Sequence, residues 1–470
     1  MGEPSSHPWA PTGKLRKSPR TARLSSRPGS DSPPTRGSFS SVSPTTTFPA
    51  VASLLGTSFP EEPEETIMSH QPSLPGTGLR VAFVTMHTSP LERAGTADAG
   101  GMNVLIAALA RALGRLGVRV DFLTRRTDPD QPEREDVAPS VTLRRLPAGP
   151  PTPLPKSEID QHVDEFREAM EALEPHDLIH SHHWMSGVAA LPVARAWGVP
   201  HVMTFHSVAA HPNSPLRDGE PPESPARVDG EVVCAEQSDL VLCVSRHEAA
   251  VVIGRCGADP ERVRIVRPGV NVDLFHPATH PWAPPGIRPG YVVFAARLQP
   301  LKAPDVAIRT MACLPDAIRP DLAVVGETSA DFTDYEAELH ALVGDLGLRG
   351  QVHFLPGQNR ESLARIVRHA SVMLVPSHSE TFGLIALEAS ASGVPVLAAA
   401  SGGLTEAICN THTGLLIPTH DPRMWAEALE ALLANEPRRK LLGATGRQRA
   451  LAMTWERAAE NTLQQYRRIL

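Results

Sequence analysis

The chain has 470 residues, 41% of them hydrophobic, as expected of a globular protein with about two domains. Its formal net charge is −7 and its lysines and arginines form no basic stripe, which argues against nucleic-acid binding and favours a small-molecule enzyme. No apolar run approaches the roughly 18 residues that cross a bilayer, and the N-terminus lacks a signal-peptide core, so we expect a cytoplasmic protein without a transmembrane segment.

Residues 1–78 contain thirteen prolines and many serines and threonines, without helical or strand periodicity. Such a composition buries too little apolar surface to offset chain entropy, so it predicts a disordered tail. Met68 lies just before the first ordered segment. We therefore also consider that the natural start is Met68, which peptides recovered from the preceding residues would exclude.

Residues 79–276 alternate strand-like and helix-like segments and predict a first domain. The run "LRVAFVTMH" is typical of a buried parallel strand, "MNVLIAALARALGRLG" of a helix, and "VRVDFLT" of a second strand. Further strand-like runs are "DLIHSHH", "PHVMTFHS", "LVLCVS" and "VRIVRPGV". This order predicts an open parallel sheet with helices on both faces.

A second domain is predicted at residues 290–451, after a proline-rich linker at 277–289. Its strand-like runs are "GYVVFAARL", "DLAVVGE", "QVHFLPG", "VMLVPS", "VPVLAAA" and "TGLLIP", with helical segments between them. Residues 452–470 have helical spacing, with Trp455, Leu463 and Tyr466 as apolar anchors, and are expected to pack back toward the first domain. The sequence therefore predicts an α/β fold of two doubly wound domains that face each other across a cleft.

Ligands of open α/β sheets bind beyond the carboxyl ends of the strands, so the loops there are the first candidates for a site. In "AGGMNV", Gly100 and Gly101 allow close backbone approach, and the following helix start favours an anion. Asn103 adds an amide that can bond a hydroxyl group. The alternative is a tight connection between strand and helix without a ligand.

Charged residues follow two strands of the second domain. In "ARLQPLKAPD", Arg297 and Lys302 suit a diphosphate, although a solvated basic pair is the common alternative. In "SHSETFGLIALEASASGVPV", Glu380 precedes a helix and Glu388 lies inside it, so the two carboxylates can reach different hydroxyl groups of one extended ligand. The amides of Gly383 and Leu384 at the helix start suit phosphate, and a surface position is the alternative for Glu388.

These two motifs together closely resemble the E-x7-E and Arg-x4-Lys signatures of the retaining GT-B glycosyltransferases of family 4, from about Arg80 to the C-terminal helix. The resemblance implies a GT-B fold of two Rossmann-like domains and transfer of a sugar from a nucleoside diphosphate with retention of configuration. It implies that Arg297 and Lys302 stabilise the leaving diphosphate, that Glu380 positions the donor sugar and that Glu388 binds the ribose. No metal or other cofactor is then expected.

Within family 4, "MHTSPLERAGTADAGGMNV", "LPAGP", "HSHHWMSG" and "QPLKAPDV" resemble the D-inositol 3-phosphate glycosyltransferases of mycothiol biosynthesis. The resemblance implies UDP-N-acetylglucosamine as donor and an inositol phosphate as acceptor. It places Gly101 and Asn103 where donor and acceptor meet, and His206 beside the donor sugar as a catalytic candidate. The acceptor-binding candidates are His87, Thr96, Lys156, His183, Ser207 and Arg227. His183 stands where those enzymes have a tyrosine, and the match near Arg227 is loose, so the acceptor is less firmly implied than the donor class.

Several alternatives remain at the level of sequence. UDP-glucose or GDP-mannose could replace UDP-N-acetylglucosamine, and a nucleotide-sugar 2-epimerase or a non-catalytic nucleotide-sugar sensor could share the fold. The histidines of "HSHHW" could bind a metal, but no carboxylate or cysteine lies nearby at ligand spacing, and the five cysteines show no CxxC pattern. The expected partners are small molecules, and we also consider a homodimer.

Overall fold

The structure, a computed structural model, describes residues 78–92, 100–209, 224–328, 332 and 334–470. Thr96 and all but the last residue of the predicted disordered tail therefore lie outside the described residues. The described residues belong to one compact unit that contains two lobes, each with its own sheet.

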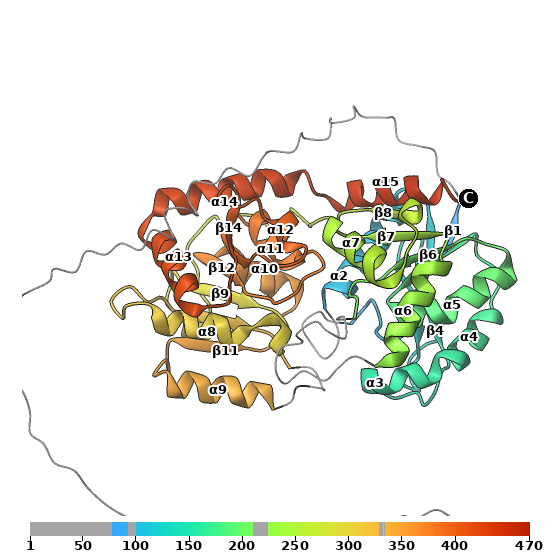
Figure 1. Cartoon of the computed structure of the whole chain (residues 1–470), viewed down its shortest axis with the longest axis horizontal. Helices are drawn as coiled ribbons and strands as arrows, with labels where there is room; N and C mark the ends of the chain where they lie inside the picture. The colour runs from blue at the N-terminus through green and yellow to red at the C-terminus, as the bar shows by residue number, and fades with distance from the viewer. Residues whose placement is uncertain (1–77, 93–99, 210–223, 329–331, 333) are drawn as a thin grey trace, which may run out of the picture. The chain divides into compact units, whose positions relative to one another are not determined.

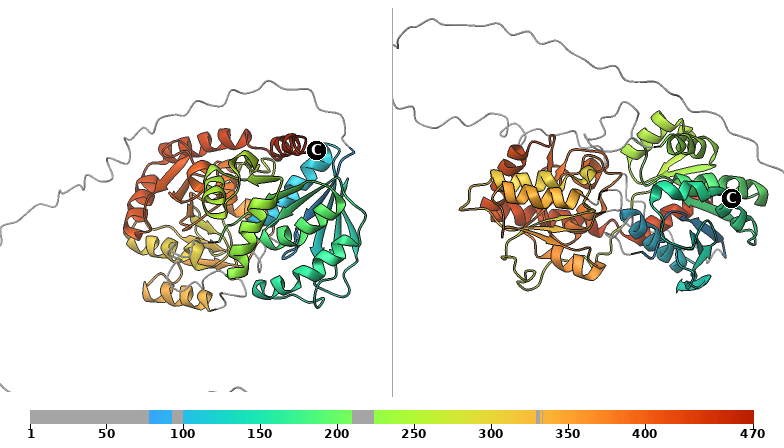
Figure 2. Two further views of the ribbon diagram at one scale, coloured as in Figure 1. Left: turned by 45° about the vertical axis from the view of Figure 1, so that its right-hand side comes forward. Right: turned by 90° about the horizontal axis from the view of Figure 1, so that it is seen from below.

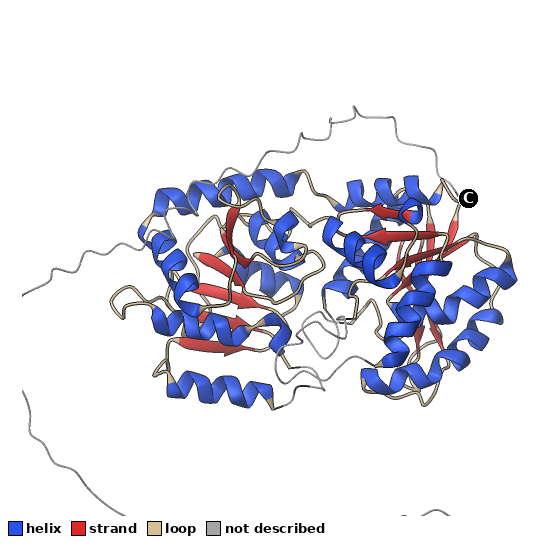
Figure 3. Cartoon of the chain, in the orientation of Figure 1, coloured by secondary structure: helices blue, strands red, loops and turns tan. Residues whose placement is uncertain are grey.

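The first lobe is built on an eight-stranded sheet in the order β3-β4-β2-β1-β5-β6-β7-β8. Its strands are among the red arrows on the right of Figure 3. Its strands are β1 (Arg80–Val84), β2 (Arg119–Arg125), β3 (Arg134–Ala138), β4 (Val141–Leu146), β5 (Leu178–His182), β6 (His201–Thr204), β7 (Leu240–Cys243) and β8 (Val263–Ile265). Neighbouring strands run parallel except β3 and β4, which are antiparallel. This pair at the sheet edge was not predicted, because β3, with the sequence REDVA, is polar and has no buried residue.

Helices cover both faces of this sheet (Figures 1 and 2). They are α2 (Gly101–Arg115), α3 (Lys156–Ile159), α4 (Val163–Glu171), α5 (Trp184–Trp197), α6 (Pro225–Gln237) and α7 (Arg246–Cys256), with 3-10 turns η1 (Asp160–His162) and η2 (Pro260–Arg262). Side chains of the central strand β1 alternate between two cores, since successive strand residues point to opposite faces. Val81 and Phe83 pack with α2, whereas Ala82 and Val84 pack with α5.

The second lobe has a six-stranded, wholly parallel sheet in the order β11-β10-β9-β12-β13-β14. Its strands are among the red arrows on the left of Figure 3. Its strands are β9 (Val292–Ala295), β10 (Leu322–Val325), β11 (Val352–Leu355), β12 (Val372–Val375), β13 (Val396–Ala399) and β14 (Gly414–Ile417). Its helices are α8 (Pro304–Cys313), α9 (Tyr335–Asp345), α10 (Arg360–Arg368), α11 (Leu384–Ala391), α12 (Leu404–Ala407), α13 (Pro422–Ala434) and α14 (Glu436–Leu451), with the turn η3 (Pro300–Lys302). The two Rossmann-like lobes confirm the predicted fold class.

The last helix, α15 (Trp455–Tyr466), packs against α2 of the first lobe. Trp455, Leu463 and Tyr466 are all buried. The start of α15 is fixed by the backbone of the first lobe, where the Val270 amide donates to the Met453 carbonyl (2.9 Å). A Cβ at Gly269 would lie 2.3 Å from the Thr454 backbone, so only glycine permits this approach.

Residues 277–289, the predicted linker, contain neither helix nor strand. Among the described residues, none of the helices has the length and apolar character needed to cross a membrane.

Candidate active site

The two lobes meet through backbone and side-chain contacts beyond the carboxyl ends of their strands. The Thr381 hydroxyl, in the loop before α11, donates to the carbonyl of His206, which follows β6 (3.1 Å). A Cβ on Gly100 would lie 3.6 Å from Nε of Arg297, and one on Gly101 3.7 Å from Cδ1 of Leu384. We call the region of these residues the lobe junction. The glycine loop therefore faces the second lobe, as an anion bound between the lobes would require.

Lys302 and Glu380 form an ion pair in the lobe junction, with 2.8 Å between Nζ and Oε1. The Ser377 hydroxyl donates to the same carboxylate oxygen (2.9 Å), and both charged side chains are largely buried. Gly402 supports this loop: its φ is +52°, and a Cβ there would lie 2.2 Å from the Glu380 carbonyl oxygen. Ser377 and Gly402 therefore hold the pair in a fixed position in the loop that carries Thr381.

Glu388 is buried inside α11, with 4% of its surface exposed, so the surface alternative for this residue is excluded. Its carboxylate pairs with Arg360 at the start of α10. The Arg360 guanidinium also lies 4.8 Å from the centre of the Phe275 ring, a cation–π arrangement. Arg360 was not singled out by the sequence, because its loop carries no motif.

Asn103 uses its amide inside the first lobe. Its oxygen accepts from the Gly100 amide (2.9 Å), and its nitrogen donates to the Thr88 hydroxyl (2.9 Å) and the Ser89 carbonyl (2.7 Å). In this structure the side chain therefore orders the two loops around the start of α2.

His206 has a strained backbone, with φ at +62°, and its ring contacts His182 of β5. The His182 Nδ1 and His206 Nε2 atoms are 2.9 Å apart. Burial lowers the pKa of His206 to about 3, so the ring is neutral near pH 7. Non-glycine residues held at positive φ cost free energy and cluster at functional sites, and His183, directly after β5, shares this feature.

His87 and His183 form a second histidine pair, with ring centres 4.1 Å apart. Nδ1 of His87 and both ring nitrogens of His183 are buried without a hydrogen-bond partner among the described residues. Burial, and then the positive charges of Lys156 and Arg227, lower the pKa of both rings. Four of the predicted acceptor-binding residues therefore lie close enough to interact electrostatically, and they give this region positive charge: His87, Lys156, His183 and Arg227.

Arg227, in the first turn of α6, is oriented by a buried carboxylate. Its Nε donates to Glu231 (2.8 Å), and its Nη2 donates to the Ser207 hydroxyl (3.1 Å). Both oxygens of Glu231 also accept from the Ala209 amide (3.0 and 2.8 Å). The i, i+4 spacing of Arg227 and Glu231 is a helical pair that the sequence could have indicated.

Of the predicted site residues, Gly101, His206, Arg297 and Leu384 lie in the lobe junction, and Lys302 pairs with Glu380 next to Thr381. Glu388 pairs with Arg360 inside the second lobe. Thr96 alone lies outside the described residues. Thr381, Glu231 and Arg360 were missed, and His182 was considered only as a possible metal ligand. Among the described residues, no group of three or more histidine, cysteine, aspartate or glutamate side chains is arranged to hold a metal ion.

Comparison with family models matches both lobes. Residues 99–274 match "Glycosyltransferase Family 4", and residues 286–449 match "Glycosyl transferases group 1". Among solved structures, sucrose-phosphate synthase from Thermosynechococcus elongatus is 30% identical, with a TM-score of 0.75 over 83% of this chain and 98% of that one. The Anabaena protein HepE in complex with UDP and glucose is 17% identical, with a TM-score of 0.65 over 82% and 98%, which shows a shared fold.

Curated relatives extend the match over most of the chain. A D-inositol 3-phosphate glycosyltransferase of Stackebrandtia nassauensis is 41% identical over 82% of this chain and 91% of its own length. One from Kribbella flavida is 40% identical over 85% and 98%. The chain therefore belongs to glycosyltransferase family 4, together with these D-inositol 3-phosphate glycosyltransferases, and has the GT-B fold.

Proposed function

We propose that this glycosyltransferase transfers N-acetylglucosamine from UDP-N-acetylglucosamine to a hydroxyl group of an inositol phosphate, with retention of configuration. The observation that carries the proposal is the arrangement of cations at the lobe junction. Lys302 is held 2.8 Å from Glu380 on the second lobe, and Arg297 lies against the glycine loop of the first. A nucleoside diphosphate is the ligand class that such a place suits.

The donor assignment is supported by the carboxylates and by similar proteins. Glu380 is positioned to accept hydrogen bonds from sugar hydroxyls, and the buried Glu388 to accept them from the ribose. To bind ribose, Glu388 would keep one oxygen on Arg360 and offer the other. HepE, which shares the fold, forms a complex with UDP and glucose, and the curated relatives are named for D-inositol 3-phosphate.

In the reaction we propose, the bond between the anomeric carbon and the β-phosphate oxygen breaks while the acceptor oxygen bonds to the same face of that carbon. The acceptor proton passes to the departing phosphate oxygen. Charge therefore builds up on the diphosphate, and Arg297 and Lys302 stabilise it from fixed positions. Preorganised groups of this kind are often the largest single contribution to catalysis, and no metal is required of the enzyme.

The acceptor phosphate is assigned to the first lobe. The paired rings of His87 and His183 lie within the electrostatic influence of two cations, Lys156 and Arg227. The Ser207 hydroxyl, bonded to Arg227, adds a further hydrogen-bonding group. The unpartnered nitrogens of the two histidines suit the oxygens of a phosphate monoester.

A screen of three donors against several acceptors tests the proposal. UDP-N-acetylglucosamine, UDP-glucose and GDP-mannose would each be combined with inositol 1-phosphate, inositol 3-phosphate and free inositol, with and without EDTA. We expect transfer from UDP-N-acetylglucosamine to a phosphorylated inositol, unaffected by EDTA, and an α-configured product by proton NMR. Transfer only to unphosphorylated acceptors, release of an epimerised sugar or a β-configured product would contradict it.

A further inference from the structure

His182 holds the ring of His206 in one orientation. It is the last residue of β5, it is fully buried, and its Nδ1 lies 2.9 Å from Nε2 of His206. Its ring packs against Phe83, with ring centres 4.8 Å apart, and against His180, with ring centres 4.2 Å apart, and these two rings also contact each other. With both neighbours in place, the His182 ring has little freedom to turn away from His206.

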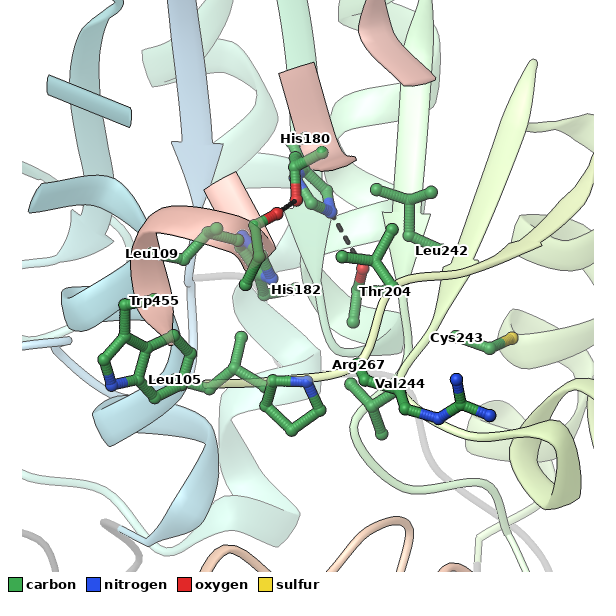
Figure 4. A pocket seen from close by; sticks show the side chains of 14 residues that line it. Leu105, Leu109, His180, His182, Thr204, Leu242, Cys243, Val244, Arg267 and Trp455 are labelled. Atoms are coloured by element: carbon green, nitrogen blue, oxygen red, sulfur yellow. Dashed lines mark hydrogen bonds between the residues drawn. The ribbon is translucent and has the colours of Figure 1, made fainter. Parts of the chain in front are cut away.

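His180 is itself tied to the C-terminal helix. Its Nδ1 lies 2.6 Å from the Tyr466 hydroxyl of α15, and its Nε2 lies 2.8 Å from the Thr204 hydroxyl of β6. Figure 4 shows His180, His182 and Thr204 lining one side of a small cavity near Trp455. The cavity measures about 20 Å³, and most of its other lining residues are apolar, so a water there would find few partners.

Both rings of the His182–His206 pair are neutral at physiological pH. Burial lowers the pKa of His206 to about 3, and burial followed by the neighbouring histidines lowers the pKa of His182 well below its usual value. In a bond between two neutral imidazoles, one nitrogen carries the proton and donates it, and the other accepts. The pair therefore has two alternative arrangements.

The other nitrogen of His182 decides between them. Its Nε2 is buried and has no hydrogen-bond partner among the described residues. An unpaired buried N–H is rarer in proteins than an unpaired acceptor. The proton of His182 therefore belongs on Nδ1, where it is donated to Nε2 of His206, and the proton of His206 belongs on Nδ1.

We infer that His182 is a positioning residue that fixes His206 as the Nδ1–H tautomer. His206 then presents a hydrogen-bond donor, and not a base, to an oxygen atom of the bound sugar donor. The backbone of His206 is fixed as well, because Thr381 of the second lobe holds its carbonyl group. The role of the donated hydrogen bond rests on the proposed function, whereas the tautomer does not.

The tautomer can be measured directly in the full-length protein. Nitrogen-15 NMR of histidine-labelled enzyme separates protonated from bare ring nitrogens, and the His206 signals are those lost in His206→Asn. We expect a protonated Nδ1 and a bare Nε2 at pH 7.5. A protonated Nε2 on His206 would overturn the inference, and this experiment needs no variant of His182.

Variants of His182 test the consequence for transfer. His182→Leu removes the donor, so we expect kcat to fall roughly ten- to hundredfold, the size of one lost transition-state hydrogen bond, with both KM values within about threefold of the parent. His182→Asn places an amide nitrogen near the position of Nδ1, so it should recover part of kcat and the Nδ1–H signal. Unchanged kcat and tautomer in His182→Leu would contradict the inference.

The matched control is His201→Gln. His201 is also a fully buried histidine of this sheet, bonded to the hydroxyls of Ser238 (2.9 Å) and Ser181 (2.8 Å), with no ring contact to His206. Its loss should lower stability but leave kcat and the His206 tautomer unchanged. An equal loss of kcat in this control would mean that the effect of His182 is structural. If the parent enzyme transfers no sugar in the screen, the proposed function fails while the NMR result still decides the tautomer.

Discussion

The two sides of the lobe junction use charge differently. On the second lobe, Lys302 and Arg360 are each paired with a glutamate, Glu380 and Glu388. The first lobe instead has neutral histidines whose pKa values are lowered mainly by desolvation: His180, His182, His183 and His201 are buried, and His87 and His206 are half-buried. Under the proposed function, the donor-binding cations are paired before binding, whereas Nδ1 of His87 and the ring nitrogens of His183, which have no partner among the described residues, would gain one only from the ligand.

The largest expected difference is the response to acid. A histidine with a folded pKa below its unfolded value of about 6.5 contributes stability that is complete above pH 6.5 and is lost as the pH falls. For His201 and His206, whose folded pKa values are both about 3, the loss at pH 5 is about 2 kcal/mol each. Glu248 acts in the opposite direction because burial raises its pKa to about 7, so it offsets roughly one or two histidines.

Hydrogen exchange at pH 7.5 and 5 would measure this difference by lobe, after correction for the intrinsic pH dependence of exchange. We expect the first sheet to lose protection on acidification before the second sheet, since the shifted histidines all lie in the first lobe. The shifted carboxylates Asp121 and Asp321 have lowered pKa values and so titrate below this range. Equal loss in the two sheets, or earlier loss in the second, would contradict the comparison.

The next largest effect should come from the donor-side ion pair. In the proposed reaction Lys302 stabilises the leaving diphosphate and Glu380 orients Lys302, so we expect kcat to fall roughly 10²- to 10³-fold in both Lys302→Ala and Glu380→Gln. Steady-state kinetics with circular dichroism would separate this from unfolding. Lys440→Ala is the control, because Lys440 forms an exposed i, i+4 pair with Glu436 away from the lobe junction. Near-normal turnover in either donor-side variant would refute the assignment.

A smaller effect is expected at the acceptor-side ion pair. Arg227→Met should raise the acceptor KM about 10- to 100-fold while leaving the donor KM unchanged, and it should destabilise the protein by about 3–5 kcal/mol because Glu231 remains buried without its partner. Adding Glu231→Met should restore most of the stability but not the acceptor KM. If the double variant also regained acceptor affinity, Arg227 would have a structural role only.

The sequence predicted the architecture well because apolar strands and intervening helices leave strong local patterns. It also identified Lys302, Glu380 and Glu388, whose spacing forms a motif. It did not reveal Arg360, Thr381 or His182, because their importance depends on which loops meet after folding. The polar edge strand β3 was missed for a related reason, since its pairing with β4 comes from position and not from its own composition.

The smallest effect is expected at a contact between the lobes that does not involve the Lys302–Glu380 or Arg227–Glu231 pairs. Glu406 of α12 accepts from the His247 amide at the start of α7 (3.1 Å) and lies 3.3 Å from Arg267. Arg267 is partly exposed, so the pair should contribute no more than about 1 kcal/mol. Glu406→Gln, which keeps one acceptor oxygen, should therefore raise both KM values no more than about threefold and leave kcat unchanged. Both substrates are proposed to bind between the lobes, so weakening a contact that joins the lobes should affect both KM values. A rise confined to one substrate would contradict this expectation, and it would show that only that substrate depends on the lobes staying together.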